Sequence, residues 1–194
     1  MFINQNILGI VMCGGQSTRM GQDKGLLLKG NLTWVELAIK KLHNLHVPTL
    51  VSINSSQLEK YTGIIESDHL VTDTTNIPGP LGGVLSVHLK YPTHDILILA
   101  CDMIDITINS MQYLFNYCTE EGSEFDFIVY TNEQNQPEPL LGWYSSEGLS
   151  KIYKYYLMGI LEKFSMKHIL EISNTHYLAF PNPYDELKNY NNMF

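Results

Sequence analysis

A glycine-rich loop near the N-terminus of this 194-residue chain carries residue types that suit phosphate groups. The loop runs from Gly14 to Lys24, reads GGQSTRMGQDK, and holds Arg19, the single arginine among twelve basic residues. Its three glycines let backbone N–H groups approach an anion, because they lack side chains and tolerate positive φ. Arg19 offers a rigid fork of donors to phosphate oxygens, and Lys24 adds a second positive charge. The loop therefore predicts a triphosphate site.

The spacing of this loop excludes two common phosphate-binding motifs. It does not end in Gly-Lys-Ser/Thr, as a P-loop does, and it contains no GxGxxG, the fingerprint of dinucleotide-binding folds. The alternative without a ligand is a lysine-biased composition in which one arginine stands in a turn by chance. The presence of both cations within eleven residues favours the phosphate interpretation.

Asp102, Asp73 and Asn54 each follow a short apolar run and are further candidate ligands. The carboxyl ends of parallel strands meet at one edge of a sheet, where ligands bind. Mg²⁺ prefers a few carboxylates together with phosphate oxygens, which makes Asp102 the candidate metal ligand. As an aspartate before a helix, it could equally be an N-cap. Asp73 is expected to contact the base or ribose, or else to be a turn residue.

The elements that must position these side chains follow from the apolar pattern. Strands are expected at 6–13, 49–53, 70–72, 95–101, 126–131, 140–144 and 176–180. Helices are expected from Thr33, where Glu36 completes a capping box, and at 84–89, at 106–117 and within 145–171. This alternation predicts an α/β fold, Rossmann-like, with a mostly parallel sheet and helices on both faces. We expect a single domain over residues 1–194, with a frayed tail at about 189–194.

Composition narrows the class of protein. A formal net charge of −8 argues against nucleic acid and anionic membranes as partners, since both need a basic surface. No apolar run approaches the ~18 residues of a membrane span, and the N-terminus has no signal-peptide pattern. Three widely spaced cysteines are typical of reduced thiols, so a cytoplasmic location is expected. Cys13 and Cys101 end two neighbouring strands and should lie together as small buried side chains.

Taken together, these segments resemble the molybdenum cofactor guanylyltransferase (MobA-like) family. Its members carry LAGGxSxRMGxDK after a strand, and residues 12–24 here read MCGGQSTRMGQDK. Later family elements resemble GPLGG, CDMI, PLLGWY and NPYDEL at 79–83, 101–104, 139–144 and 182–187, in the family's order. Met12-Cys13 replaces Leu-Ala, Ile104 replaces a proline, and the last element is degenerate, so the acceptor side is less firmly indicated than the nucleotide side.

The resemblance implies a fold of the nucleotide-diphospho-sugar transferase type and a reaction without a protein nucleophile. The terminal phosphate of molybdopterin, with or without molybdenum, would attack the α-phosphorus of GTP and release pyrophosphate. Catalysis would then be positioning and charge neutralisation by Arg19, Lys24, Asp102 and backbone amides. The residues implied to bind GTP are Met12, Cys13, Gly14, Gly15, Lys24, Asn54, Asp73 and Asp102, with Asp102 also holding Mg²⁺.

Partners implied by the resemblance are GTP and molybdopterin, with transient contacts to other cofactor-biosynthesis proteins or recipient molybdoenzymes. Another transferase of the same fold, using CTP on molybdopterin or a nucleotide on a sugar phosphate, is an alternative. A non-catalytic nucleotide-binding protein is a second one. The retention of both cations together with Asp102 argues against the second, because binding alone could survive without a metal ligand.

Overall fold

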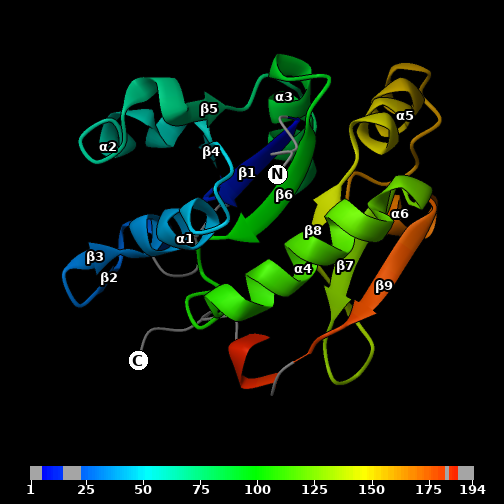
Figure 1. The fold of residues 1–194 in the computed structure, drawn as a ribbon. Coiled ribbons are helices and arrows are strands. Elements are labelled where there is room, and N and C mark those ends of the chain that lie inside the picture. The colour runs from blue at the N-terminus through cyan, green and yellow to red at the C-terminus, as the bar shows by residue number, and fades with distance from the viewer. Residues whose placement is uncertain (1–5, 15–22, 182–183, 188–194) are drawn as a thin grey trace.

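The computed structural model describes residues 6–14, 23–181 and 184–187. Within these residues the main sheet has seven strands in the order β5-β4-β1-β6-β8-β7-β9 (Figure 1). The strands are β1 (Ile7–Met12), β4 (Thr49–Ile53), β5 (Leu70–Thr72), β6 (Asp95–Ala100), β7 (Phe127–Thr131), β8 (Pro137–Tyr144) and β9 (Thr175–Ala179). Every residue of β1 is buried, which agrees with its continuous apolar sequence and its place inside the sheet.

The sheet is mixed, because one of its strands runs against the others. β1 pairs in parallel with β4 and β6, β4 with β5, and β7 with β9. β8 is antiparallel to both of its neighbours, β6 and β7. The fold class predicted from the sequence is confirmed, and the direction of β8 is the feature that the apolar pattern could not provide.

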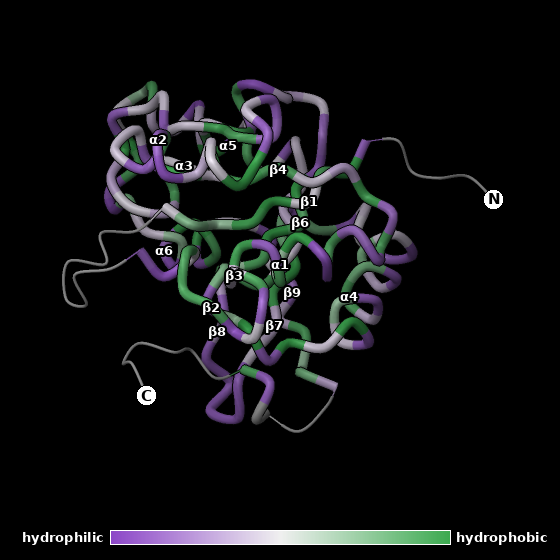
Figure 2. Tube along the Cα trace, turned by 90° about the vertical axis from the view of Figure 1, so that its left-hand side faces the viewer, coloured by the Kyte–Doolittle hydropathy of each residue, from purple (hydrophilic) through white to green (hydrophobic). Residues whose placement is uncertain are grey.

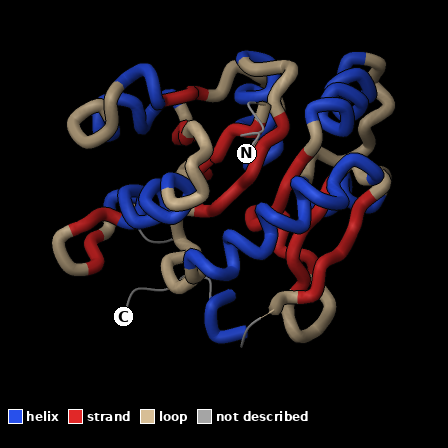
Figure 3. The backbone as a smooth tube through the Cα atoms, in the orientation of Figure 1, coloured by secondary structure: helices blue, strands red, loops and turns tan. Residues whose placement is uncertain are grey.

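Helices cover both faces of the sheet (Figure 3). A separate hydrophobic core lies under each group of helices. One core includes residues of α1 (Trp34–His43), α2 (Leu58–Tyr61) and α4 (Ile108–Glu121). The other includes residues of α3 (Pro80–Lys90), α5 (Ser146–Leu157) and α6 (Met166–Glu171). Figure 2 shows the hydrophobic strands β1 and β6 in the middle of the molecule. This burial is the main stabilising contribution to the fold.

Local signals in the sequence set several element ends. Thr33 begins α1 with the predicted capping box, in which the Glu36 carboxylate accepts hydrogen bonds from the Thr33 N–H (2.7 Å) and hydroxyl (2.6 Å). The helix expected from residue 106 begins at Ile108, with Thr107 as its N-cap. The helical region expected at 145–171 is interrupted, because α5 ends at Leu157 and α6 begins at Met166.

Short elements escaped the sequence analysis because they hold too few residues to show a period. A hairpin joins β2 (Leu28–Lys29) to β3 (Leu32–Thr33) through Gly30, whose φ is 65°. The 3₁₀ turns are η1 (Lys24–Leu26), η2 (Ser55–Gln57), η3 (Ser67–His69), η4 (Gly122–Glu124) and η5 (Tyr184–Leu187). No helix in the described ranges is long and apolar enough to cross a membrane.

Candidate functional site

The carboxyl ends of β1, β4 and β6 are joined by backbone hydrogen bonds beyond the strands themselves. The N–H groups of Cys13 and Gly14 both donate to Ser52 O, at 2.9 and 3.1 Å. The N–H of Cys101 donates to Met12 O at 3.1 Å. The segments that follow these three strands therefore start side by side at one edge of the sheet, as expected for an open parallel sheet.

Lys24 and Asp102 form an ion pair across this edge. Lys24 Nζ donates to Asp102 Oδ2 at 2.8 Å, and the two side chains are 17% and 19% exposed. An exposed pair contributes only ~0–1 kcal/mol, but partial burial reduces screening by water. Two of the three residues predicted to be catalytic therefore lie in contact. Arg19 and Gly15 lie outside the described residues.

Asp73 lies at a close approach between the end of β5 and helix α3. A Cβ placed on Gly83 would lie 2.7 Å from Ser52 Oγ, 3.0 Å from Met12 Cε and 3.3 Å from Asp73 Oδ1. Burial raises the pKa of Asp73. Among the described residues Ser52 Oγ is buried without a hydrogen-bond partner. Glycine at 83 thus leaves room for two polar side chains, one of which the sequence had indicated.

Asn54 lies next to Gly14 in the turn that follows β4. Its backbone N–H donates to Gln57 Oε1 at 2.9 Å, and its side-chain Oδ1 accepts from Ser56 Oγ at 2.6 Å. A Cβ on Gly14 would lie 3.8 Å from Asn54 N. The structure therefore places Asn54 beside the glycine-rich segment, and its role toward a ligand stays a prediction.

The two cysteines at the strand ends lie together, as the sequence indicated. Both Cys13 and Cys101 are buried, at 7% and 6% exposure. A hydrogen bond with Cys13 and burial raise the pKa of the Cys101 thiol well above its usual value. A protonated thiol is neither a good nucleophile nor a metal ligand, so Cys101 fits a packing role.

Lys41 of α1 holds the segment that follows Asp102, and no sequence signal had pointed to it. Its Nζ donates to Ile104 O at 2.8 Å and to Met103 O at 3.1 Å. Burial lowers the pKa of Lys41 to about 8; Lys29 also lowers it, and Asp105 opposes the shift. Lys41 follows another lysine, Lys40, in the same helix, so only its tertiary contacts distinguish it.

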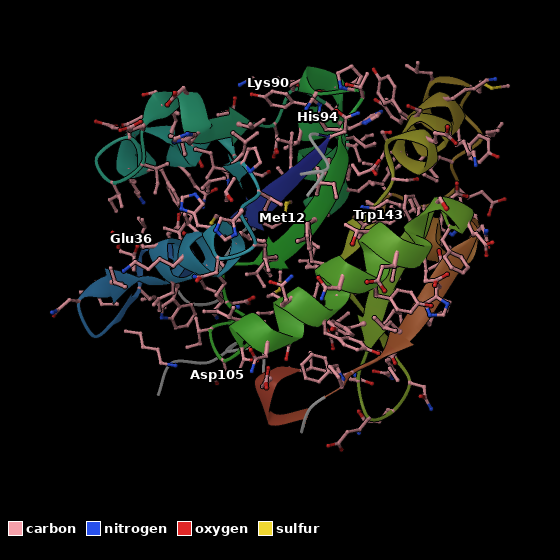
Figure 4. The ribbon with its side chains drawn as sticks, viewed as in Figure 1. Met12, Glu36, Lys90, His94, Asp105 and Trp143 are labelled. Atoms are coloured by element: carbon pink, nitrogen blue, oxygen red, sulfur yellow. The ribbon has the colours of Figure 1, made fainter. Side chains whose placement is uncertain are left out.

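Neighbouring contacts fix the rest of this segment. Lys29 Nζ pairs with Asp105 Oδ1 at 2.9 Å, and Asp105 lies beside the start of α4 (Figure 4). Glu186 of η5 accepts from the Thr107 N–H at 2.9 Å and from Ser110 Oγ at 2.7 Å. The closing element noted in the sequence thus contacts the helix that begins just after Asp102.

The start of β8 reaches the same edge of the sheet because β8 is antiparallel. Leu141 pairs with Leu99 of β6, so residues 137–139 lie beyond the end of β6. Tyr144, which is fully buried, donates from its hydroxyl to Pro139 O at 2.6 Å. The proline-leucine segment that resembled the family therefore lies on the Asp102 side of the sheet.

The donor set at this edge suits a hard divalent cation. Asp102 presents a carboxylate at the end of a buried strand, and Oδ2 is the atom paired with Lys24. Its partial exposure leaves it accessible to a cation that also binds phosphate oxygens, which is the usual arrangement for Mg²⁺. The chemistry of Asp102 therefore fits the metal expected from the sequence, and its role as a metal ligand stays a prediction.

Curated relatives match most of the chain. A protein of Flavobacterium johnsoniae named "Probable molybdenum cofactor guanylyltransferase" is 28% identical over 198 residues, covering 96% of this chain and 97% of that protein. A protein of the same name from Methanothermobacter thermautotrophicus is 32% identical over 138 residues, covering 70% of each chain.

Solved structures share the fold. Molybdopterin-guanine dinucleotide biosynthesis protein A from Archaeoglobus fulgidus superposes with a TM-score of 0.71 at 19% identity, covering 90% of this chain and 83% of that one. The Rv0371C protein of Mycobacterium tuberculosis, solved in complex with manganese, gives a TM-score of 0.61 at 12% identity, covering 94% of this chain and 96% of that one.

The family match spans the Lys24–Asp102 site and most of the fold. Residues 9–172 match the family described as the MobA-like NTP transferase domain, a range that begins in β1 and ends after α6. It includes both members of the Lys24–Asp102 pair and the close approach at Gly83. This chain belongs to the MobA-like NTP transferase family.

Proposed function

We propose that this nucleotidyltransferase transfers GMP from GTP to the terminal phosphate of molybdopterin, with or without bound molybdenum. An oxygen of the acceptor phosphate forms a bond to the α-phosphorus, and the bond from the α-phosphorus to the bridging oxygen of the β-phosphate breaks. Pyrophosphate leaves with that electron pair. The observation that carries the proposal is the Lys24–Asp102 pair beside the Gly14 turn, in a family with relatives named as guanylyltransferases.

The protein's own groups position and neutralise the reacting phosphates. The backbone at Met12, Cys13, Gly14 and Gly15, with Asn54 and Asp73, binds the nucleoside. Lys24 and Arg19 bind the triphosphate and neutralise charge as it moves toward pyrophosphate. Asp102 would hold Mg²⁺, which would supply positive charge to offset that of the phosphates. No side-chain nucleophile is needed.

The Lys24–Asp102 ion pair stabilises the site when no nucleotide is bound. Each charge is compensated by the other, so neither is left isolated in a partly buried position. A triphosphate offers Lys24 phosphate oxygens in place of the carboxylate, and Asp102 is then available to a cation. Binding of nucleotide and of metal at this edge should therefore be mutually favourable.

A thermal-shift comparison of GTP, CTP, ATP and UTP, each with Mg²⁺, tests which base the protein prefers. GTP should stabilise most, since selective binding stabilises by roughly 2.7 kcal/mol at a hundredfold excess over the dissociation constant. An equal or larger shift with CTP would overturn the guanine assignment in favour of a cytidylyl transfer.

The test of catalysis is pyrophosphate release from GTP with and without molybdopterin. We expect release only when the acceptor is present. Nucleotide binding without any acceptor-dependent release would favour the non-catalytic alternative. Partners beyond these substrates, such as recipient molybdoenzymes, belong to the same proposal and follow only if release is observed.

A further inference from the structure

A partly buried polar network lies next to Lys24. Asp23 is the N-cap of η1, the 3₁₀ turn that contains Lys24, and its Oδ1 accepts from the Gly25 N–H at 3.1 Å. The same oxygen accepts from the Tyr61 hydroxyl at 2.9 Å. The other oxygen, Oδ2, accepts from Gln57 Nε2 at 2.5 Å. One carboxylate thus receives donors from its own turn, from η2 and from α2.

Gln57 joins this carboxylate to the two strand ends that form the nucleotide edge. Its Nε2 also donates to Cys13 O at 3.1 Å, and its Oε1 accepts from the Asn54 N–H at 2.9 Å. Gln57 is only 7% exposed. A buried amide with both its donor and acceptor groups in use fixes its neighbours, because any movement would leave a buried polar atom unpaired.

Tyr61 packs against the turn η1, which contains Lys24. Its side chain is fully buried, and burial raises the pKa of its hydroxyl, which therefore stays a neutral donor. A Cβ added to Gly25 would collide with the Tyr61 hydroxyl and lie 3.3 Å from Cys13 Sγ. The turn at Lys24–Leu26 therefore lies directly on Tyr61, and its backbone has little freedom to move inward.

We infer that Asp23, Gln57 and Tyr61 are positioning residues that fix the Lys24 ammonium opposite Asp102. The inference rests on the proposed function for its phosphate readout. A lysine side chain has four rotatable bonds, so the position of its charge depends on a backbone that does not move. Gln57 and Tyr61 are buried and act on the triphosphate through Lys24 rather than by contact.

An exchange of partners tests this network. Gln57→Glu keeps the size of the side chain and the acceptor for Asn54, but it loses the donor and brings a second carboxylate to Asp23. Asp23→Asn keeps an acceptor for Gly25 and Tyr61 and supplies an amide donor. The double variant therefore restores a donor–acceptor pair between the two positions, and each single variant breaks it.

The first readout needs no activity. The rate at which acetic anhydride acetylates Lys24 is measured by mass spectrometry in the absence of nucleotide. It should be about tenfold higher in Gln57→Glu than in the wild type, because losing one hydrogen bond to a charged group corresponds to a change of about that size. The double variant should return to within about threefold of the wild type, since only the bond to Cys13 O stays lost.

The second readout separates positioning from general damage. In Gln57→Glu the dissociation constant for GTP should rise about tenfold more than that for GMP, because GMP lacks the phosphates held by Lys24 and both nucleotides share any loss at Cys13. Equal weakening for both nucleotides, or no rescue in the double variant, would show a merely structural role and overturn the inference.

Gln112→Glu is the matched control, because it makes the same chemical change on α4, where Gln112 bonds only to exposed Asn116 among the contacts described. It should leave both readouts unchanged. Should Gln57→Glu fail to fold, Tyr61→Phe removes a single donor to Asp23, and unaltered Lys24 acetylation in that variant would also overturn the inference. Altered acetylation in a protein that transfers no GMP would instead contradict the proposed function and leave the positioning role standing.

Discussion

The loops at the carboxyl edge of one half of the sheet are held differently from the β7–β8 turn of the other half. In the half formed by β5, β4, β1 and β6, side chains tie together segments that are distant in sequence. Gln57 bonds to Cys13, 44 positions away, and Lys41 bonds to Ile104, 63 positions away. These bonds form only after the strands and helices have assembled.

In the other half, the turn between β7 and β8 is held by its own residues. Asn132 Oδ1 accepts from the N–H groups of Gln134 and Gln136, at 3.0 and 2.9 Å, and Asn135 adopts a φ of 56°. Such local turns can change without disturbing distant parts of the protein. The comparison shows that one half of this edge is tied by contacts between distant segments and that the β7–β8 turn depends on its own residues. The proposed function places the nucleotide on the first of these.

The largest effect should come from Asp102→Asn. The change is isosteric and removes the one charge assigned to the metal, so turnover should fall by about 10³-fold, or ~4 kcal/mol of transition-state stabilisation. Acceptor-dependent pyrophosphate release measures it. Asp105→Asn is the control, because Asp105 lies three residues after Asp102 and pairs with half-exposed Lys29. Turnover in this variant should stay near wild type. Turnover close to wild type in Asp102→Asn would reduce that residue to an ion-pair partner of Lys24.

Two glycine-to-alanine changes should differ in whether they lower the unfolding free energy or the affinity for nucleotide. In Gly142→Ala the new Cβ would lie 2.6 Å from Val129 Cγ1 and 2.7 Å from Ile128 O, so overpacking should cost about 1–3 kcal/mol of unfolding free energy. The affinity for GTP should not change. Urea unfolding and calorimetric titration together measure the two quantities.

Gly83→Ala makes the same change in α3, next to Ser52 of β4. It crowds Ser52 and Asp73, whereas alanine also gains up to ~1 kcal/mol of helix propensity inside α3. We therefore expect a smaller loss of stability than in Gly142→Ala, together with about tenfold weaker nucleotide binding. The comparison fails if Gly142→Ala is the variant that weakens nucleotide binding.

The unfolding free energy should depend on pH through Lys41, which contacts the segment that follows β6. Its pKa in the folded protein is about 8, below the ordinary lysine value, so between pH 8 and about 10.4 the unfolded chain binds more protons at this position. The unfolding free energy of the wild type should then rise relative to Lys41→Met, by at most about 1.4 kcal/mol per pH unit. Lys29, Asp105 and Glu186 surround this group, and subtracting the variant removes their separate titration. A difference that stays constant from pH 8 to 10 would contradict the burial of the charge.

The smallest effect should follow from Asn132→Ala. It removes two exposed local hydrogen bonds and should lower the unfolding free energy by about 1 kcal/mol. Affinity for GTP should match the wild type, measured by the same titration. A loss of nucleotide affinity here would show that the two halves are coupled.

The sequence by itself determined the features whose causes are local. Apolar runs such as 95–101 became buried strands, and Thr33 with Glu36 capped a helix where expected. The glycine-rich loop and the aspartate at 102 were found by type and spacing, and the resemblance that they carried is confirmed by the family match. Each of these signals lies within a few residues of the feature that it predicts.

Tertiary structure alone decided the features that depend on distant partners. The direction of β8 follows from its pairing with β6 and β7, and an apolar run is the same in either direction. Gln57, Tyr61 and Lys41 are ordinary helix or turn residues in sequence. They acquire a role only because folding brings their polar atoms against groups many positions away, where a hydrogen bond must be made or its free energy lost.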